Sequence, residues 1–132
     1  MEITETLYVK TREEWREWLI KHLKNKKEIW FVFYKKATSK PTVSYSDAVE
    51  EALCYGWIDG IRKKVDDERY THRFSPRHFG SNWSEPNKAR ALKMLCEGKM
   101  TNAGIKLLPD GLLEKWSKTN KKKLKKVILK KQ

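Results

Sequence analysis

The chain has 132 residues, of which 39% are hydrophobic, and a formal net charge of +13 at pH 7. This length suits one domain with its own core and excludes two domains of ordinary size. Its two cysteines, Cys54 and Cys96, lack the CxxC or CxxH spacing of a zinc site, so we expect reduced thiols, no metal and no cofactor. The sequence has no secretion signal and no stretch long enough for a transmembrane helix, which predicts a cytoplasmic protein.

The positive charge is concentrated in two regions of different composition. Residues 115–132 contain nine lysines and no acid, whereas residues 60–90 contain eight Lys or Arg against four Asp or Glu and hold five of the seven arginines. Arginine offers a planar fork that matches phosphate or carboxylate, and lysine acts as a hydrated point charge. We therefore expect the two regions to have different roles.

The first elements in the chain are a short strand, a helix and a second strand. Residues 6–10 predict the short strand, and Thr11 with Glu14 forms a capping box that starts the helix. The apolar face of this helix would consist of Trp15, Trp18, Leu19, His22 and Leu23, with Arg16 left to water. Residues 29–34 are apolar on both faces and rich in β-forming residues, which indicates a central strand.

A second helix and a hairpin follow the central strand. Ser44 can cap a helix that ends at Gly56. Its apolar stripe would be Tyr45, Ala48, Val49, Ala52 and Leu53. Residues 57–77 alternate loosely, with the best strand at 69–74 and a turn at 65–68, so a hairpin is expected here.

The last predicted helices lie beyond residue 83. Ser84 caps a helix with Pro86 in its first turn, where a missing N–H is harmless. We expect its buried face to consist of Ala89, Leu92, Leu95 and Cys96. A short helix at 101–108 and a turn at 109–111 follow, and the lysine run should then be frayed because its like charges repel at i,i+4 spacing.

These elements predict an α+β fold in a single domain. A small, mainly antiparallel sheet containing residues 29–34 and 57–74 would be covered by about three main helices. We expect the folded domain to cover residues 1–114 and a basic C-terminal tail to cover residues 115–132.

Several motifs in the middle of the chain resemble the ordered signature of the YdeI/OmpD-associated family, which is also described as bacteriocin-protection or OmdA-like. These are residues 53–60 (LCYGWIDG), Arg62-Lys63, residues 73–77 (RFSPR), residues 81–84 (SNWS) and Asn87. The similarity extends from about Leu7 to Leu108. The resemblance implies a link to bacterial envelope stress or bacteriocin protection, in a family whose general activity is unassigned. The lysine tail lies outside the family pattern.

The arginines of this region, beside a capped helix start, have the composition of an anion-binding site. Arginine side chains and the free N–H groups of a helix N-terminus together favour a phosphate or carboxylate. The ligand-binding residues expected on this hypothesis are Trp57, Asp59, Arg62, Lys63, Arg73, Arg77, Trp83, Ser84 and Asn87. A structural alternative remains open, in which the arginines pair with Asp59, Asp66 and Asp67 and stack on Trp57 or Trp83.

The sequence also offers catalytic candidates. Asp59 could act as a general base or could form an Asx-type turn, and His72 and His78 flank residues 73–77 without an evident partner, which favours a surface position. Cys54 on an apolar helix is expected to be inert packing rather than an activated thiol. No Walker loop, dinucleotide fingerprint, GxSxG or HExxH motif is present in the sequence.

The preferred function is therefore recognition of an anionic small molecule or of a nucleic-acid phosphate. The alternatives are an enzyme acting on a phosphorylated or carboxylated small molecule, with Asp59 or His72 as acid or base, and nonspecific nucleic-acid binding by the lysine tail. A tail of this kind can also contact an acidic surface or serve solubility alone.

Overall fold

The computed structural model describes residues 1–119. The chain divides into two compact units. Unit 1 comprises Met1–Ala52 and Trp57–Pro76, and unit 2 comprises Leu53–Gly56 and Arg77–Gln132. The predicted α+β class is confirmed. A helix spans the predicted boundary at residue 115, and the remainder of the predicted lysine tail, residues 120–132, lies outside the described residues.

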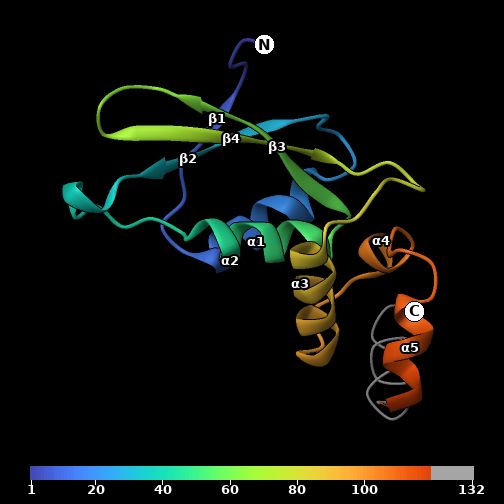
Figure 1. Cartoon of the computed structure of the whole chain (residues 1–132). Coiled ribbons are helices and arrows are strands. Elements are labelled where there is room, and N and C mark those ends of the chain that lie inside the picture. Colours follow the sequence, from blue (N-terminus) through green and yellow to red (C-terminus); the bar gives the residue numbers. More distant parts are fainter. Residues whose placement is uncertain (120–132) are drawn as a thin grey trace. The chain divides into compact units, whose positions relative to one another are not determined.

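Unit 1 contains a four-stranded sheet in the order β1-β2-β4-β3. The strands are β1 (Thr6–Leu7), β2 (Ile29–Tyr34), β3 (Trp57–Lys64) and β4 (Arg69–Pro76), and only the β1–β2 pair is parallel. The predicted inner strand at 29–34 and the predicted hairpin are thus confirmed. Both long antiparallel pairs include β4, which therefore lies between the apolar strand β2 and the charged strand β3 (Figure 1).

Two helices lie on the same side of this sheet, α1 (Arg12–His22) and α2 (Tyr45–Cys54) (Figure 1). Their predicted caps are confirmed, because the backbone N–H of Glu14 donates to Thr11 and that of Asp47 donates to Ser44. Trp15 is fully buried, and its ring contacts Phe31 at 4.8 Å between ring centroids. Its indole N–H also donates to the Ala48 carbonyl at 2.9 Å, which satisfies the buried donor and joins α1 to α2.

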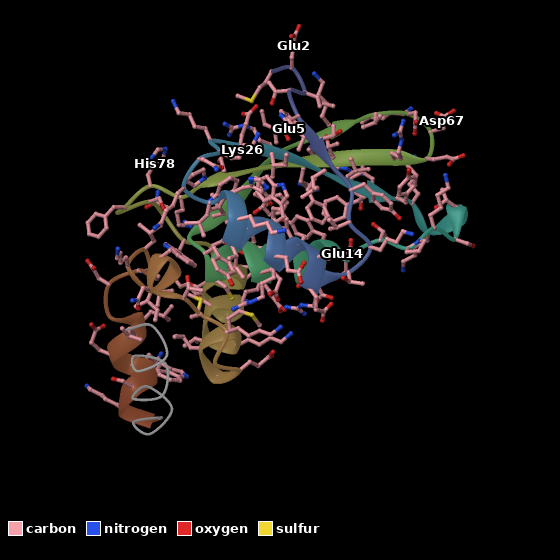
Figure 2. The ribbon with its side chains drawn as sticks, turned by 180° about the vertical axis from the view of Figure 1, so that it is seen from behind. Glu2, Glu5, Glu14, Lys26, Asp67 and His78 are labelled. Carbon is pink, nitrogen blue, oxygen red and sulfur yellow. The ribbon has the colours of Figure 1, made fainter. Side chains whose placement is uncertain are left out.

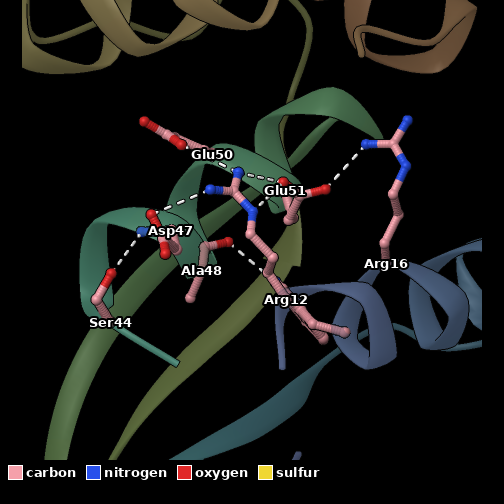
Figure 3. A network of polar contacts seen from close by, with 8 residues as sticks. Arg12, Arg16, Ser44, Asp47, Ala48, Glu50 and Glu51 are labelled. Atoms are coloured by element: carbon pink, nitrogen blue, oxygen red, sulfur yellow. Dashed lines mark hydrogen bonds and ion pairs between the residues drawn. The ribbon is translucent and has the colours of Figure 1, made fainter. Parts of the chain in front are cut away.

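A network of ion pairs joins the same two helices (Figure 3). The Arg12 guanidinium binds Glu51, Glu50 at 3.0 Å and Asp47 at 3.1 Å, and Arg16 binds the other oxygen of Glu51 at 2.9 Å. Burial opposes the charge of Arg12, but its hydrogen bonds to Glu51 and Glu50 and the neighbouring carboxylate charges raise its pKa overall. The prediction that Arg16 points to water is wrong, because Glu51 is 1% exposed and requires a cation.

The N-terminal residues contact the other sheet face, which carries Arg73 and the fully buried Trp30. Thr4 donates to Glu28, and Lys26 pairs with Glu5 at 2.9 Å (Figure 2). The two faces of the sheet therefore contact different parts of unit 1.

Unit 2 consists of α3 (Glu85–Cys96), α4 (Asn102–Ile105) and α5 (Leu112–Thr119). The Ser84 cap is confirmed, because its Oγ accepts from the Asn87 N–H at 3.2 Å. A Cβ on Gly104 would lie 2.6 Å from the carbonyl oxygens of Leu53 and Cys54, so the close approach of α4 requires a glycine. Of residues 1–119, no helical segment has the length and apolar character needed to cross a membrane.

The predicted buried face of α3 is wrong for most of its residues. Its buried residues are Ala91, Met94 and Leu95, whereas Ala89 and Cys96 are exposed. Ala89 and Leu92 instead line a cleft of about 520 Å³ whose opposite wall is formed by residues 109–112 and Lys115. The sequence had not predicted α5, whose Trp116 is 3% exposed and donates its indole N–H to the sulfur of Cys96 at 3.2 Å.

We predict that Arg12→Met destabilises the fold by about 3 kcal/mol in urea-induced unfolding. The substitution removes the cation that Glu50 and Glu51 share, and a buried carboxylate without its partner is strongly unfavourable. The matched control is Arg69→Met, which removes an exposed pair with Asp66 and should lower the free energy of unfolding much less than Arg12→Met does. Equal losses in the two variants would show that the helix network is not a main source of stability.

Candidate functional site

A β-bulge in β3 brings two oppositely charged side chains onto one face of the sheet. Asp59 pairs with Phe74 and Arg62 pairs with His72, so Gly60 and Ile61 together face a single β4 residue, Arg73. In a regular strand, residues three apart point to opposite faces, and the extra residue of a bulge reverses this relation. Asp59 and Arg62 consequently share the face that is covered by α1 and α2.

His72 lies among aromatic rings on that face. Its ring centroid is 4.8 Å from that of Tyr45 at the start of α2, and 5.6 Å from that of Phe33 on β2. Tyr70 lies two residues earlier on β4. Its ring centroid is 6.0 Å from that of His72 in an edge-to-face arrangement, and the Tyr70 ring stacks on Phe33. His72 is therefore held by three aromatic neighbours from three different elements.

The two charged residues are each oriented by a tyrosine. The Tyr45 hydroxyl donates to Oδ2 of Asp59, and the Arg62 guanidinium carbon lies 4.2 Å from the centre of the Tyr70 ring. A guanidinium stacked on an aromatic face is restricted in orientation and keeps its N–H groups available at the edge. We call the set Tyr45, Asp59, Arg62, Tyr70 and His72 the His72 cluster.

Burial lowers the pKa of His72 from its ordinary value of 6.5. The Asp59 charge and a hydrogen bond with the Gly60 backbone act in the opposite direction, and the positive charge of Arg62 lowers the pKa further. Nδ1 of His72 is buried and has no hydrogen-bond partner among the described residues. Since buried polar groups in native proteins normally have a partner, this nitrogen is an unsatisfied group within the cluster.

The other predicted ligand-binding residues of unit 1 do not join the cluster. Arg73 follows His72 directly and points to the opposite face, where its Nε pairs with Glu28 at 2.6 Å. Lys63 also alternates away and donates to the Met1 carbonyl at 2.7 Å. Trp57 is 1% exposed and packs against Trp18, so its interpretation as a core residue is confirmed.

In the structural alternative, the arginines of the predicted site pair with Asp59, Asp66 and Asp67. Two of these acids, Asp66 and Asp67, have other partners. Asp66 pairs with Arg69 at 2.7 Å and Asp67 pairs with Lys64 at 3.3 Å, at the tip of the β3–β4 hairpin (Figure 2). Asp66 also accepts the backbone N–H groups of Glu68 and Arg69, and its hydrogen bonds, first among them that from the Arg69 side chain, lower its pKa to about 2. The Asx-type turn of this region is thus made by Asp66.

In unit 2, the Arg77 side chain is buried and contacts Trp83, Ser81 and Asn82. It is 8% exposed, its guanidinium carbon lies 3.9 Å from the Trp83 ring centre, and Nη1 donates to Ser81 and to the Asn82 carbonyl. Trp83 in turn donates to the Leu107 carbonyl at 3.2 Å. The predicted stacking of an arginine on Trp83 is therefore confirmed.

The remaining predicted site residues of unit 2 serve the start of α3. Ser84 accepts the Asn87 backbone N–H, and Asn87 Oδ1 accepts from Arg90 at 2.8 Å. His78 is exposed, as predicted, whereas His72 is half-buried against Tyr45 with its Nδ1 buried, and so departs from the surface position predicted for it. Cys54 is buried, in agreement with its predicted role in packing.

Sequence reasoning identified Asp59, Arg62 and His72 but missed Tyr45 and Tyr70 as members of the site. Tyr45 was assigned only to the apolar stripe of its helix, and its contact with β4 depends on the tertiary structure. A signal for the bulge was nevertheless present, because Gly60 interrupts a strand directly after a polar residue.

Comparison with known proteins gives the class of domain but no activity. Residues 7–107 match the family described as a domain of unknown function, DUF8412, and the chain belongs to this family. No curated protein and no solved structure matches the chain.

The His72 environment predicts opposite effects of two substitutions on the pKa of His72. Arg62→Met should raise it, because a cation that disfavours protonation is removed, and Asp59→Asn should lower it, because a stabilising carboxylate is lost. The measurement is the pH titration of the ring protons by NMR, with His72→Phe used for assignment. The control is Arg69→Met, which lies on the opposite sheet face and should leave the pKa of His72 unchanged. Shifts of the same sign in Arg62→Met and Asp59→Asn would contradict the placement of the two charges beside His72.

Proposed function

We propose that unit 1 binds a small molecule that carries a carboxylate or phosphate group, and that Arg62 receives this group. The observation that carries the proposal is the bulge, which directs Arg62 toward the face occupied by His72, Asp59 and Tyr45. Bulges commonly re-aim side chains next to functional sites.

The partners of the other arginines support the choice of Arg62. The four remaining arginines of unit 1 each pair with at least one acid. Arg62 forms no ion pair within residues 1–119, and its side chain is exposed while its guanidinium stacks on Tyr70. An oriented, accessible guanidinium loses little conformational freedom when it binds a planar anion, which favours binding.

Catalysis on such a molecule is a second candidate, favoured by the state of His72. Because its pKa is lowered, the ring is mainly neutral near pH 7 and can accept a proton. Its unsatisfied Nδ1 and the nearby Asp59 supply acid or base groups, and Arg62 would stabilise developing negative charge. Turnover of a carboxylate or phosphate ester that is lost in His72→Gln, with binding retained, would distinguish this candidate from simple recognition.

We further propose a family relation and a location for this protein. The relation to the YdeI/OmpD-associated family is supported by the ordered motifs between residues 53 and 87, which include the bulged segment of β3. A cytoplasmic location is supported by Cys54 and Cys96, neither of which forms a disulfide in the described part of the chain. Nucleic-acid binding by the lysine tail concerns mainly residues outside the described range and stays a prediction.

The anion proposal predicts that Arg62→Met weakens binding of phenyl phosphate and 3-phenylpropionate by about tenfold or more, because a charge-assisted hydrogen bond is lost. Binding is measured by NMR titration of the full chain at pH 7. Arg69→Met removes the same charge from the opposite sheet face and should change the affinity by less than about twofold. Equal weakening in the two variants would mean that net charge, rather than the His72 cluster, attracts these anions.

A further inference from the structure

We propose that the molecule bound at the His72 cluster is a small zwitterion, whose carboxylate binds Arg62 and whose ammonium group binds Asp59. This inference rests on the proposed function, because it assigns a second group to the ligand held by Arg62. The structural basis is the presence of one cation and one anion on the same sheet face, on either side of a bulge.

The local charge favours such a ligand over a simple dianion. Asp59 raises the pKa of His72 and Arg62 lowers it. Both charges therefore lie within electrostatic reach of the same ring. With His72 neutral, the cluster has no net charge. A phosphate dianion would be attracted by Arg62 and repelled by Asp59, whereas a zwitterion gains from both residues.

Asp59 has the capacity to bind an ammonium group. Its Oδ2 accepts the Tyr45 hydroxyl, which fixes the carboxylate, and an ionised carboxylate can accept about four hydrogen bonds in total. The side chain is partly exposed, as are the rings of Tyr45 and Tyr70.

The spacing of the two residues limits the size of the ligand. Their partners on β4, Phe74 and His72, are two residues apart, which places the backbones of Asp59 and Arg62 about 7 Å apart along the sheet. A small molecule with an amino group and a carboxylate on one short carbon chain, each with a hydrogen bond of about 3 Å, spans a distance of this order. The inferred class is thus a compound with the amino-acid arrangement of charges.

Three probes that share one phenyl ring test the inference in the full chain at pH 7. L-Phenylalanine carries both charges, 3-phenylpropionate carries only the carboxylate, and 2-phenylethylamine carries only the ammonium group. We expect L-phenylalanine to bind about tenfold more tightly than either of the others, in NMR titrations followed at the His72 ring protons.

Two substitutions should separate the two contacts. Arg62→Met is expected to weaken binding of L-phenylalanine and 3-phenylpropionate but to spare 2-phenylethylamine. Asp59→Asn is expected to weaken binding of L-phenylalanine and 2-phenylethylamine but to spare 3-phenylpropionate. Arg69→Met, which removes a charge from the other face, is the control and should preserve the order of the three affinities.

The outcomes also separate this inference from the anion proposal. If 3-phenylpropionate binds as tightly as L-phenylalanine and depends on Arg62, the zwitterion inference is overturned and the anion proposal stands. If binding depends on Asp59 alone, both are overturned. Failure of all three probes at millimolar concentration overturns the inference, and phenyl phosphate then decides the anion proposal.

A folding defect in Asp59→Asn would be recognised with Tyr45→Phe. This variant removes the hydrogen bond from Tyr45 to Asp59 but retains the carboxylate. Because the Asp59 charge remains, L-phenylalanine should bind more tightly to Tyr45→Phe than to Asp59→Asn, and equal weakening in the two variants would contradict a role for the Asp59 charge.

Discussion

The ion pairs between Arg12 and the carboxylates of α2 are the constraint on which the arrangement of unit 1 depends. Glu50 and Glu51 are 3% and 1% exposed, and two carboxylates at this depth are tolerated only beside cations that also satisfy their hydrogen bonds. Arg12 and Arg16 come from successive turns of α1, so both ends of the Glu51 carboxylate are held. Together with the indole bond from Trp15, this network fixes the register of α2 against α1.

The fixed position of α2 determines where Tyr45 lies, and Tyr45 links the helices to the His72 cluster. As the first residue of α2, it contacts the His72 ring and donates to Asp59. The bulge supplies the second condition, because without it Arg62 would point to the opposite face from Asp59. The cluster thus requires a long-range helix contact and a local irregularity of one strand.

Much of the fold could be predicted from local sequence, because caps, turns and apolar runs act over a few residues. The Thr11 and Ser44 caps and the strand Ile29–Tyr34 are of this kind. The pairing of Arg12 with Glu51 could not be predicted, since it joins residues 39 apart in the chain. For α3, alternative apolar stripes were available: the helix buries the one containing Met94, and another lines the cleft beside residues 109–112.

Net charge does not distinguish Arg62 from the other arginines of unit 1. The +13 is concentrated in arginines and lysines of residues 60–90 and in lysines of residues 115–132, yet most arginines of unit 1 are neutralised by specific acids. Because side chains alternate along β4 and β3, Arg73 and Arg62 lie on opposite faces of the sheet. What distinguishes Arg62 is its orientation beside His72 and Asp59. Selectivity at such a site follows from the arrangement of unlike charges, and a basic surface elsewhere in the chain neither creates it nor replaces it.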